Sequence, residues 1–438
     1  VGLPQQWRVA LKKRMLTLPI RSVGTMMKRD SWHFLFLNIG HFLDHYFLLI
    51  FATAAALVLA REWGLSYGIL IAYATPGFFA FGLCSYPAGW LADKWSRRGM
   101  ICVFYFGIGI FSIFAGFANT PFQIGSAQLL VGFFAAIYHP VGLAMVTQRW
   151  RNTGMRIAIN GVWGNLGVAS AALVTGYFID NVGWRAAFIV PGFVSILVGI
   201  GYAVLCWTDP AEDGGHSPVL VPSFGAAAPD HRAMIWRVSV IVFFVTALSS
   251  VVFQATTFAL PKIFDERIKG VVTDMAGYLN SFGVAGTINV ASIVGAFAFV
   301  VFVVASFAQL VVGCLLDRFG PRSVFIGAAA VQVVFFGLMA GLRDVWALAV
   351  VLGFMLGAFG QIPITDYMIA KLASGPARAR VYGVRYVVSF SALAASLPLI
   401  AFVYEQWGFD TLFRLLSAAA LIILLAVLCL PRRLPATN

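Results

Sequence analysis

The stretch Gly89-Trp-Leu-Ala-Asp93-Lys94-Trp-Ser-Arg97-Arg98 lies between two long apolar runs and holds one acidic and three basic residues. A second copy, Gly313-Cys-Leu-Leu-Asp317-Arg318-Phe-Gly320-Pro-Arg322, follows another apolar run further along the chain. The first glycines of the two copies are 224 positions apart, and so are the two aspartates. A repeat of this length, in which each copy closes an apolar segment, predicts two homologous halves of a membrane protein.

The composition is typical of a protein that spans a bilayer many times. Of the 438 residues, 61% are hydrophobic and only 11% are charged, and the mean hydropathy is +0.88. A soluble protein of this size could not bury so much apolar surface. The apolar runs are also too long for barrel strands, which alternate polar and apolar residues over about 10 positions. We therefore predict an all-α polytopic membrane protein.

Twelve apolar runs are long enough for a helix to cross a hydrocarbon core of about 30 Å. Short loops separate most of them, and one long polar stretch lies between the sixth run and the seventh. The expected spans lie near Trp32–Ala60, Ser66–Leu91, Met100–Ala118, Phe122–Gln148, Ile157–Ile179, Ala186–Cys206, Val238–Leu260, Val290–Leu316, Val324–Gly341, Trp346–Leu372, Val381–Tyr404 and Phe409–Leu430.

The long polar stretch divides the chain into two six-helix bundles. Within the segment 262–289 the second half has about nineteen residues more than the first half, and we expect a longer external loop or a reentrant segment there. The basic N-terminal segment has apolar residues at helical spacing, namely Trp7, Leu11, Met15 and Leu18. It is therefore either a disordered tail or a short helix on the anionic inner leaflet. The first apolar run is too long for a cleaved signal peptide. The predicted divisions are a basic N-terminal segment (1–30), an N-terminal bundle (31–207), a linker (208–236), a C-terminal bundle (237–430) and a tail (431–438).

The net charge of +13 is concentrated on one side of the predicted membrane. Of the 30 Lys and Arg, 22 fall in or at the edges of the N-terminal segment, the linker, the tail and the loops on that same side. This positive-inside bias predicts a cytoplasmic (inner or plasma) membrane protein with both termini in the cytoplasm, and it argues against nucleic-acid binding. The five cysteines lie in apolar spans without paired or metal-ligand spacing, and we interpret them as packing residues.

The first span carries a group of polar and ionisable residues, which are costly in a bilayer core and are therefore functional candidates. Asn38, His41, Asp44 and His45 share one helical face because of their spacing. Asp44 lies about 18 Å along the helix, near the bilayer midplane. A carboxylate and an imidazole there can load and release a proton, so we predict Asp44 with His41 as the proton-coupling pair. The alternatives are a divalent-metal site made of His41, Asp44 and His45, or hydrogen bonds that only tie this helix to its neighbours.

Polar residues in later spans are expected to line a substrate cavity. Pro140 opens the helix after Tyr138-His139, which a membrane tolerates where the backbone lines a cavity. His139 is then a second proton site or a hydrogen-bond donor to the substrate, or else part of a packed kink. In the fifth span, Gly161-Val-Trp-Gly164-Asn165-Leu-Gly167 offers small residues that permit close helix packing. The expected cavity residues are Asn38, His45, Tyr73, His139, Trp163, Asn165, Gln361 and Arg385.

The second half places Gln361, Pro363 and Asp366 in the tenth span, and Arg385 at similar depth in the eleventh. We favour an Asp366–Arg385 ion pair that opens and closes with the cytoplasmic gate. A permanent structural pair is the alternative, because mutual neutralisation is a common fate of buried charges. Arg385 is also a candidate contact for an anionic substrate.

The repeated motif Gly-x-x-x-Asp-Arg/Lys-x-Gly-x-Arg resembles the loop between helices two and three of the major facilitator superfamily, and the resemblance covers nearly the whole chain. It implies alternating access around a midplane site, with Gly89, Asp93 and Arg98 holding the outward-facing state; the alternative is that the loops only set topology. Asp93 is expected to accept hydrogen bonds at a helix N-terminus across the interface of the halves. Arg97 and Arg98 are expected to pair with acids or lipid phosphates. The expected gating residues are Gly89, Asp93, Arg97, Arg98, Gly313, Asp317, Arg318, Arg322 and Asp366.

Within that superfamily, His41-x-x-Asp44, Tyr138-His139-Pro140 and Gly164-Asn165-Leu-Gly167 look most like the fosmidomycin-resistance-type drug/proton antiporters, although the Gly-Pro pair of superfamily antiporters is absent. This resemblance implies export of a small organic molecule in exchange for protons. We expect a monomer that uses the proton gradient and no cofactor. The alternatives are uptake of an organic anion or metabolite, and an iron-type carrier of divalent metal. No nucleophile–base constellation is present, so we do not expect an enzyme.

Overall fold

The computed structural model describes residues 20–149, 153–209, 229–282, 289–372 and 378–431, and the regular secondary structure in these ranges is entirely helical. This finding confirms the predicted all-α class. The N-terminal residues at helical spacing, most of the predicted linker and nearly all of the predicted tail lie outside the described residues.

The first half of the chain forms six membrane crossings, because a helix satisfies all of its own backbone hydrogen bonds inside the bilayer. Side-chain caps start several of these helices: Ser66, Ser96 and Thr120 each accept a hydrogen bond from the backbone N–H three residues later. The first, second and fourth crossings are each built from more than one element. The elements are α2 (Ile20–Ala54), the π-helix η1 (Ala55–Leu59), α3 (Ala60–Glu62), α4 (Tyr67–Ala72), α5 (Thr75–Lys94), α6 (Arg97–Gly116), α7 (Pro121–Ala135), α8 (Tyr138–Arg149), α9 (Thr153–Asn181) and α10 (Trp184–Thr208).

The second half repeats this plan with one additional helix. Among the described residues, eleven helices are long and apolar enough to cross a membrane. The last of them contains Gly408, whose φ of 71° is non-helical and divides it into two crossings, so the twelve predicted spans are all present. The elements are α11 (Pro229–Arg267), α12 (Lys269–Ser281), α13 (Val290–Phe319), α14 (Pro321–Met339), α15 (Asp344–Leu372) and α16 (Arg378–Leu428).

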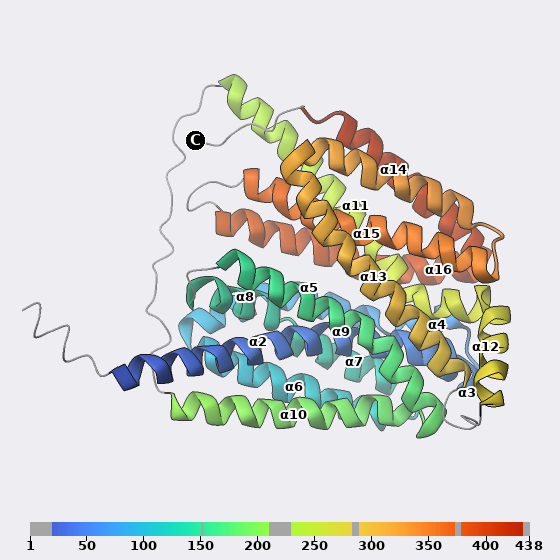
Figure 1. Cartoon of the computed structure of the whole chain (residues 1–438), viewed down its shortest axis with the longest axis horizontal. Helices are drawn as coiled ribbons and strands as arrows, with labels where there is room; N and C mark the ends of the chain where they lie inside the picture. The colour runs from blue at the N-terminus through green and yellow to red at the C-terminus, as the bar shows by residue number, and fades with distance from the viewer. Residues whose placement is uncertain (1–19, 150–152, 210–228, 283–288, 373–377, 432–438) are drawn as a thin grey trace, which may run out of the picture.

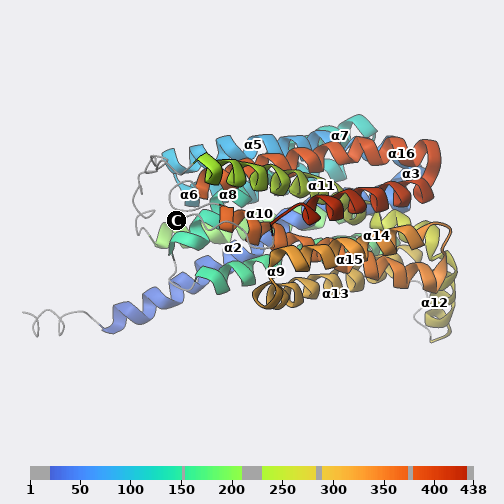
Figure 2. The same cartoon turned by 90° about the horizontal axis from the view of Figure 1, so that it is seen from above.

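The two halves form two bundles that lie side by side in Figure 1, with α2 to α10 in one and α11 to α16 in the other. Seen from above, the two bundles overlap (Figure 2). Helices α9 and α13 cross so closely that their backbones are in contact. A β-carbon at Gly176 would lie 2.2 Å from the carbonyl oxygen of Ala291, and one at Gly295 would lie 2.4 Å from that of Ala172. Small residues therefore permit the close approach that joins the bundles.

Hydrogen bonds join the bundles at the end remote from the two repeated loops, which we call the closed end. Asp180 of α9 accepts hydrogen bonds from the backbone N–H groups of Asn289 (3.1 Å) and Ser292 (2.7 Å). The carboxylate of Glu405 in α16 accepts another from the N–H of Gly68 in α4 (2.8 Å). In Figure 1 the bundles meet at this end and diverge toward the other.

The extra segment of the second half forms part of the closed end. Helix α11 continues to Arg267, and α12 then lies across the ends of α13 and α15 (Figure 1). Its side chains Met275 and Tyr278 are exposed. Helix α12 lies at the edge of the bundle and not between its helices, which argues against the reentrant arrangement for this part of the segment.

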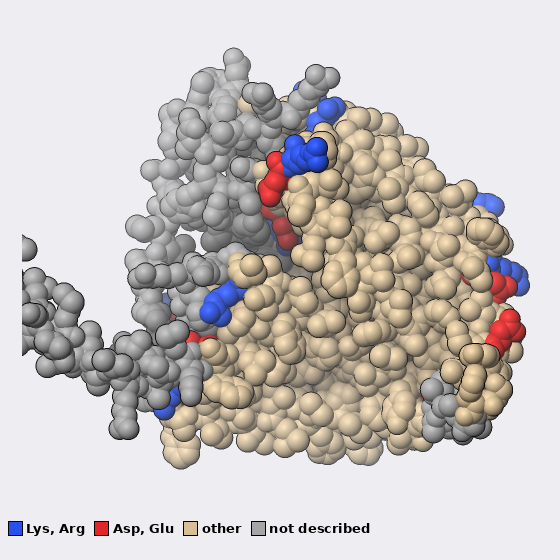
Figure 3. All heavy atoms as spheres, in the orientation of Figure 1, with Lys and Arg blue, Asp and Glu red and all other residues tan. Residues whose placement is uncertain are grey.

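The outer surface has the charge distribution of a membrane protein. On the face shown in Figure 3, Lys, Arg, Asp and Glu gather toward the two ends of the helices and leave a broad belt without charge. Large apolar side chains point outward, and Phe79, Leu83 and Phe193 expose 58%, 64% and 54% of their surface. Such a continuous apolar surface is stable against lipid tails but not in water. The chain is therefore an integral membrane protein.

Candidate functional site

A cavity of about 580 Å³ lies between the bundles and is lined by side chains from both of them. Helices α2, α8 and α9 line it on the N-terminal side, and α11, α13, α15 and α16 on the other. Its lining extends to Ile157 near the start of α9 and to Arg385 near the start of α16, so it reaches toward the end with the repeated loops. Of the predicted residues, the lining includes His41, His45, His139, Asn165, Gln361, Asp366 and Arg385 and leaves out Asn38, Asp44, Tyr73 and Trp163.

Asp44 is completely buried behind the wall of the cavity. Its Oδ2 lies 3.3 Å from Nε2 of His139, whose ring lines the cavity. Neither carboxylate oxygen accepts a well-aligned hydrogen bond from the described residues. The imidazole in contact with Asp44 is therefore that of His139 in α8. The partner that we predicted, His41, lies in α2, the helix that also contains Asp44.

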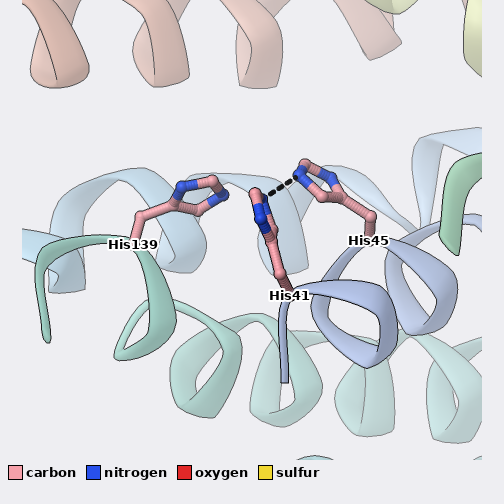
Figure 4. A group of neighbouring side chains, drawn as sticks. All are labelled: His41, His45 and His139. Carbon is pink, nitrogen blue, oxygen red and sulfur yellow. Dashed lines mark hydrogen bonds between the residues drawn. The ribbon is translucent and has the colours of Figure 1, made fainter. Parts of the chain in front are cut away.

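Three imidazole rings, those of His41, His45 and His139, point toward one another at the cavity wall (Figure 4). One nitrogen from each ring lies within 4.8 Å of the others. Nε2 of His45 is hydrogen-bonded to Nε2 of His41 at 3.2 Å. The spacing of four residues places the first two rings on one turn of α2, and only the packing of α8 against α2 adds the third.

The orientation of His41 is set by its neighbours. Its Nδ1 lies 2.8 Å from the carbonyl oxygen of Asn160, so Nδ1 carries the proton and donates it. Its ring stacks on Tyr138, with centroids 5.0 Å apart and an interplanar angle of 25°. A β-carbon at Gly164 would lie 2.7 Å from Nε2, so the glycine of the fifth span leaves space for this imidazole.

A buried hydrogen-bond network lies beneath the histidines. The Asn160 side chain donates to Oδ1 of Asn38 (3.0 Å) and to the hydroxyl of Tyr138 (2.9 Å), and that hydroxyl donates to the carbonyl of Leu37 (2.6 Å). Asn38, which we expected in the cavity, thus ties α2 to α9. Asn160 is absent from our predicted residues, although a buried amide in an apolar span is itself a signal of function or of helix pairing.

The break between α7 and α8 positions His139. Helix α7 ends at Ala135 and α8 begins at Tyr138, so the ring of Pro140 meets no continuous helix on its N-terminal side. The ring of His139 then lies 5.7 Å, between centroids, from both Phe81 of α5 and Phe390 of α16. His139 therefore also contacts the C-terminal bundle.

On the opposite wall, Asp366 of α15 and Arg385 of α16 form the predicted ion pair. Deeper in the bundle, the amide of Gln361 donates to Gln332 of α14 at 2.6 Å. Gln332 is completely buried, and we did not predict it, because no motif or charge marks it in the sequence.

Asn165 of α9 connects the two walls of the cavity. Its amide donates to Oε1 of Gln309 in α13 at 3.3 Å. Tyr73 lies outside the cavity and packs against Gly125 of α7, where a β-carbon would be 3.0 Å from its ring. The aromatic lining that the sequence suggested is therefore supplied by other residues, including Phe253, Phe307 and Phe390.

The first copy of the repeated motif makes its described contacts within the N-terminal bundle. Arg97 donates to Asp93 at 2.6 Å. Arg98 is buried and donates to the carbonyl oxygen of Asp209 at the end of α10 (2.6 Å), and Nε2 of His33 lies 3.1 Å from the Asp209 carboxylate. Arg98 also lies 3.8 Å from the Asp209 carboxylate, so both arginines lie beside acids, but within one bundle and not at the interface of the halves where we expected them. A β-carbon at Gly89 would lie 3.2 Å from Pro140, so Gly89 permits α5 to approach α8.

The second copy has fewer described contacts. Arg322 donates to the carbonyl oxygen of Leu428 at 2.9 Å and so connects α14 to the end of α16. Asp317 and Arg318 are exposed, and a β-carbon at Gly313 would meet no atom within 4 Å. The two copies therefore share a sequence pattern and a position in their bundles but not their contacts in this conformation.

Comparisons with known proteins agree with this architecture. The family model described as Major Facilitator Superfamily matches residues 37–302 and 289–438. The puromycin resistance protein pur8 of Streptomyces alboniger is 30% identical over 149 residues, which are 33% of this chain and 28% of that protein. The multidrug resistance protein MdtG of Yersinia enterocolitica is 24% identical over 341 residues, or 76% of this chain and 77% of that protein. The crystal structure of the nucleoside transporter NupG shares the fold, with a TM-score of 0.65 and 14% identity over 91% of this chain and 98% of that one.

Proposed function

Because the chain belongs to the major facilitator superfamily, we propose that it is a transporter that exports a small organic molecule in exchange for protons. The observation that carries this proposal is the contact between Asp44 and His139 at the wall of a cavity shared by both bundles. The resistance proteins among its relatives support export of a drug-like compound. Within the superfamily, we propose that the chain belongs to the branch of the fosmidomycin-resistance-type drug/proton antiporters.

Alternating access is supported by the position of the cavity. The cavity reaches toward the repeated loops, while Asp180 and Glu405 hold the bundles together at the closed end. The positive-inside rule assigns the loop side to the cytoplasm, so both termini are cytoplasmic and this conformation is inward-facing. Transport then requires the closed end to open while the bundles meet at the loop side, by rocking of one bundle against the other.

Proton coupling is assigned to Asp44 because of its burial. A carboxylate inside the bilayer is costly unless a proton or a partner neutralises it, and such residues mark proton relays in transporters. His139 touches Asp44 and also faces the cavity, so a proton that leaves Asp44 reaches the cavity through this imidazole. The two bundles of one chain complete the cavity, so a monomer suffices. The proton gradient supplies the energy, and no cofactor is required.

Uptake of an organic anion is the second candidate function. One observation favours it: the guanidinium group of Arg385 lies at the cavity wall, where it could bind a carboxylate or phosphate in two parallel hydrogen bonds. Asp366 would have to release Arg385 for this contact, because the two form an ion pair in the described conformation.

A susceptibility panel tests the direction of transport. Cells lacking their own efflux pumps would express wild type, Asp44→Asn or no transporter, at matched membrane levels, and face antibiotics, dyes and organic acids. We expect wild type to confer resistance to at least one compound and Asp44→Asn to lose it. Increased sensitivity in cells with wild type would reverse the direction and favour uptake. Equal resistance in both would keep export but remove Asp44 as the coupling residue.

A further inference from the structure

We propose that His41, His45 and His139 bind a divalent transition-metal ion, of the class of Zn²⁺, Ni²⁺ or Co²⁺, at the wall of the central cavity. Neither the family nor the similarity to drug exporters assigns such a site. The residues also differ from the set His41, Asp44 and His45 that the sequence suggested as an alternative metal site, because His139 takes the place of Asp44.

The distances between the nitrogens suit a single ion. Metal–nitrogen bonds of about 2.0–2.1 Å in tetrahedral geometry place neighbouring donors about 3.4 Å apart. The Nε2 atoms of His41 and His45 are already 3.2 Å apart, and one nitrogen from each of the three rings lies within 4.8 Å of the other two. A small rotation of the His139 side chain therefore closes the site. The three rings converge from two helices in Figure 4.

The ligand set selects the class of metal. Three imidazoles suit Zn²⁺, Ni²⁺, Co²⁺ or Cu²⁺, whereas Mg²⁺ and Ca²⁺ prefer oxygen ligands. The carboxylate of Asp44, 3.3 Å from Nε2 of His139, adds a negative charge beside the ion, which favours a dication over an uncharged occupant.

An outer contact orients the ring of His41 as such contacts do in known metal sites. Ligating histidines usually donate their second N–H to a backbone carbonyl or a carboxylate, and this hydrogen bond fixes the tautomer. Nδ1 of His41 makes this bond to the carbonyl of Asn160 (2.8 Å), so its Nε2 presents a lone pair to the cluster. Tyr138 stacks on the same ring and Gly164 leaves it space, so the ring is held before any ion arrives.

An ion bound to three imidazoles keeps a coordination position for another ligand. All three histidines line the cavity and are half-buried, so this position faces the cavity and not the protein core. An ion can therefore enter from the loop side. Water or an oxygen-bearing molecule in the cavity would complete its coordination.

Binding is tested on the full chain, purified in detergent with an affinity tag that contains no histidine. Isothermal titration with Ni²⁺ and Zn²⁺ should give one ion per chain, and Mg²⁺ should give no binding. X-ray absorption at the zinc edge should show three imidazole nitrogens at about 2.0–2.1 Å. This second measurement needs no variant. Since no gradient or substrate is involved, the result is independent of whether the protein exports drugs.

Variants locate the ion. His45→Asn should lower the affinity at least tenfold, because even the loss of an outer partner of a ligand costs about 10–100-fold. His33→Asn removes one histidine from the same helix, outside the cluster, and should bind as wild type does. Absence of Ni²⁺ and Zn²⁺ binding by wild type would overturn the proposal. So would equal affinities of wild type and a folded His45→Asn variant, or a zinc spectrum dominated by oxygen ligands.

Discussion

Nε2 of His139 and Oδ2 of Asp44 lie 3.3 Å apart, and this contact joins α8 to α2 within the N-terminal bundle. It depends on the break before Pro140, which lets a side chain of α8 contact a buried carboxylate and the cavity at once. A proton that enters the cavity therefore has access to Asp44 through one imidazole.

Replacing Asp44 by Asn removes the ionisable group but preserves the size of the side chain. We expect transport driven by a pH gradient to fall to background, because no carboxylate is left to carry the proton. Exchange of labelled substrate across the membrane without a gradient should continue, because it needs no net proton movement. Both rates are measured in proteoliposomes.

The matched control for this experiment is Asp274→Asn, which changes an exposed aspartate of α12 at the closed end. It should leave both rates unchanged. If the Asp44→Asn variant loses both substrate exchange and gradient-driven transport, Asp44 acts in substrate binding or folding. This outcome would contradict its assignment to proton coupling.

Gly176→Ala is expected to destabilise the contact between α9 and α13. The new β-carbon would lie 2.2 Å from the carbonyl oxygen of Ala291, so the backbones must separate, at a cost of about 1–3 kcal/mol. The thermal unfolding midpoint in detergent should fall. Gly161→Ala in the same helix is the control, because a β-carbon there meets nothing within 4 Å. Equal midpoints for the two variants would show that α9 and α13 do not pack as described.

Asp180→Ala should favour opening of the closed end. It removes the acceptor of the N–H groups of Asn289 and Ser292, and hydrogen bonds to a charged group are worth about 1.5–3 kcal/mol each. The ratio of outward-facing to inward-facing molecules should therefore rise about tenfold or more. Spin labels at the exposed positions Val182 and Tyr278, one in each bundle, report the change as a longer distance.

The control for the gate is Asp274→Ala, which removes an acidic residue near the same end without breaking a described contact between the bundles. Its distance distribution should match that of wild type. A distribution for Asp180→Ala that also matches wild type would mean that Asp180 does not hold the closed end.

The Asp366–Arg385 pair is tested by exchanging the two charges. If the pair works as a gate, Asp366→Ala and Arg385→Ala should each reduce transport, because each removes one partner of the ion pair at the cavity wall. The double variant Asp366→Arg with Arg385→Asp restores the attraction and should recover transport. If the double variant folds normally but does not recover transport, this result would instead indicate that Arg385 itself contacts the substrate.

Much of the fold was predictable because the decisive information is local. Each crossing had to be a long apolar run that satisfies its own backbone hydrogen bonds, and the copies at Gly89 and Gly313 indicated the two halves. The helix boundaries extended beyond the predicted spans by a few residues in most cases. Gly408 was the least obvious boundary, since only its positive φ separates the last two crossings within α16.

The sequence alone determined that His41 and His45 share a face of one helix, because residues four positions apart are neighbours on any α-helix. Only the tertiary structure decided that His139 joins them and contacts Asp44. It also decided that Asn38 is hydrogen-bonded to Asn160 and does not line the cavity, and that Arg98 reaches Asp209. These contacts depend on the rotation and depth at which one helix packs against another. Close approaches at residues such as Gly164 set that packing, and the periodicity of a single helix contains no information about its partner.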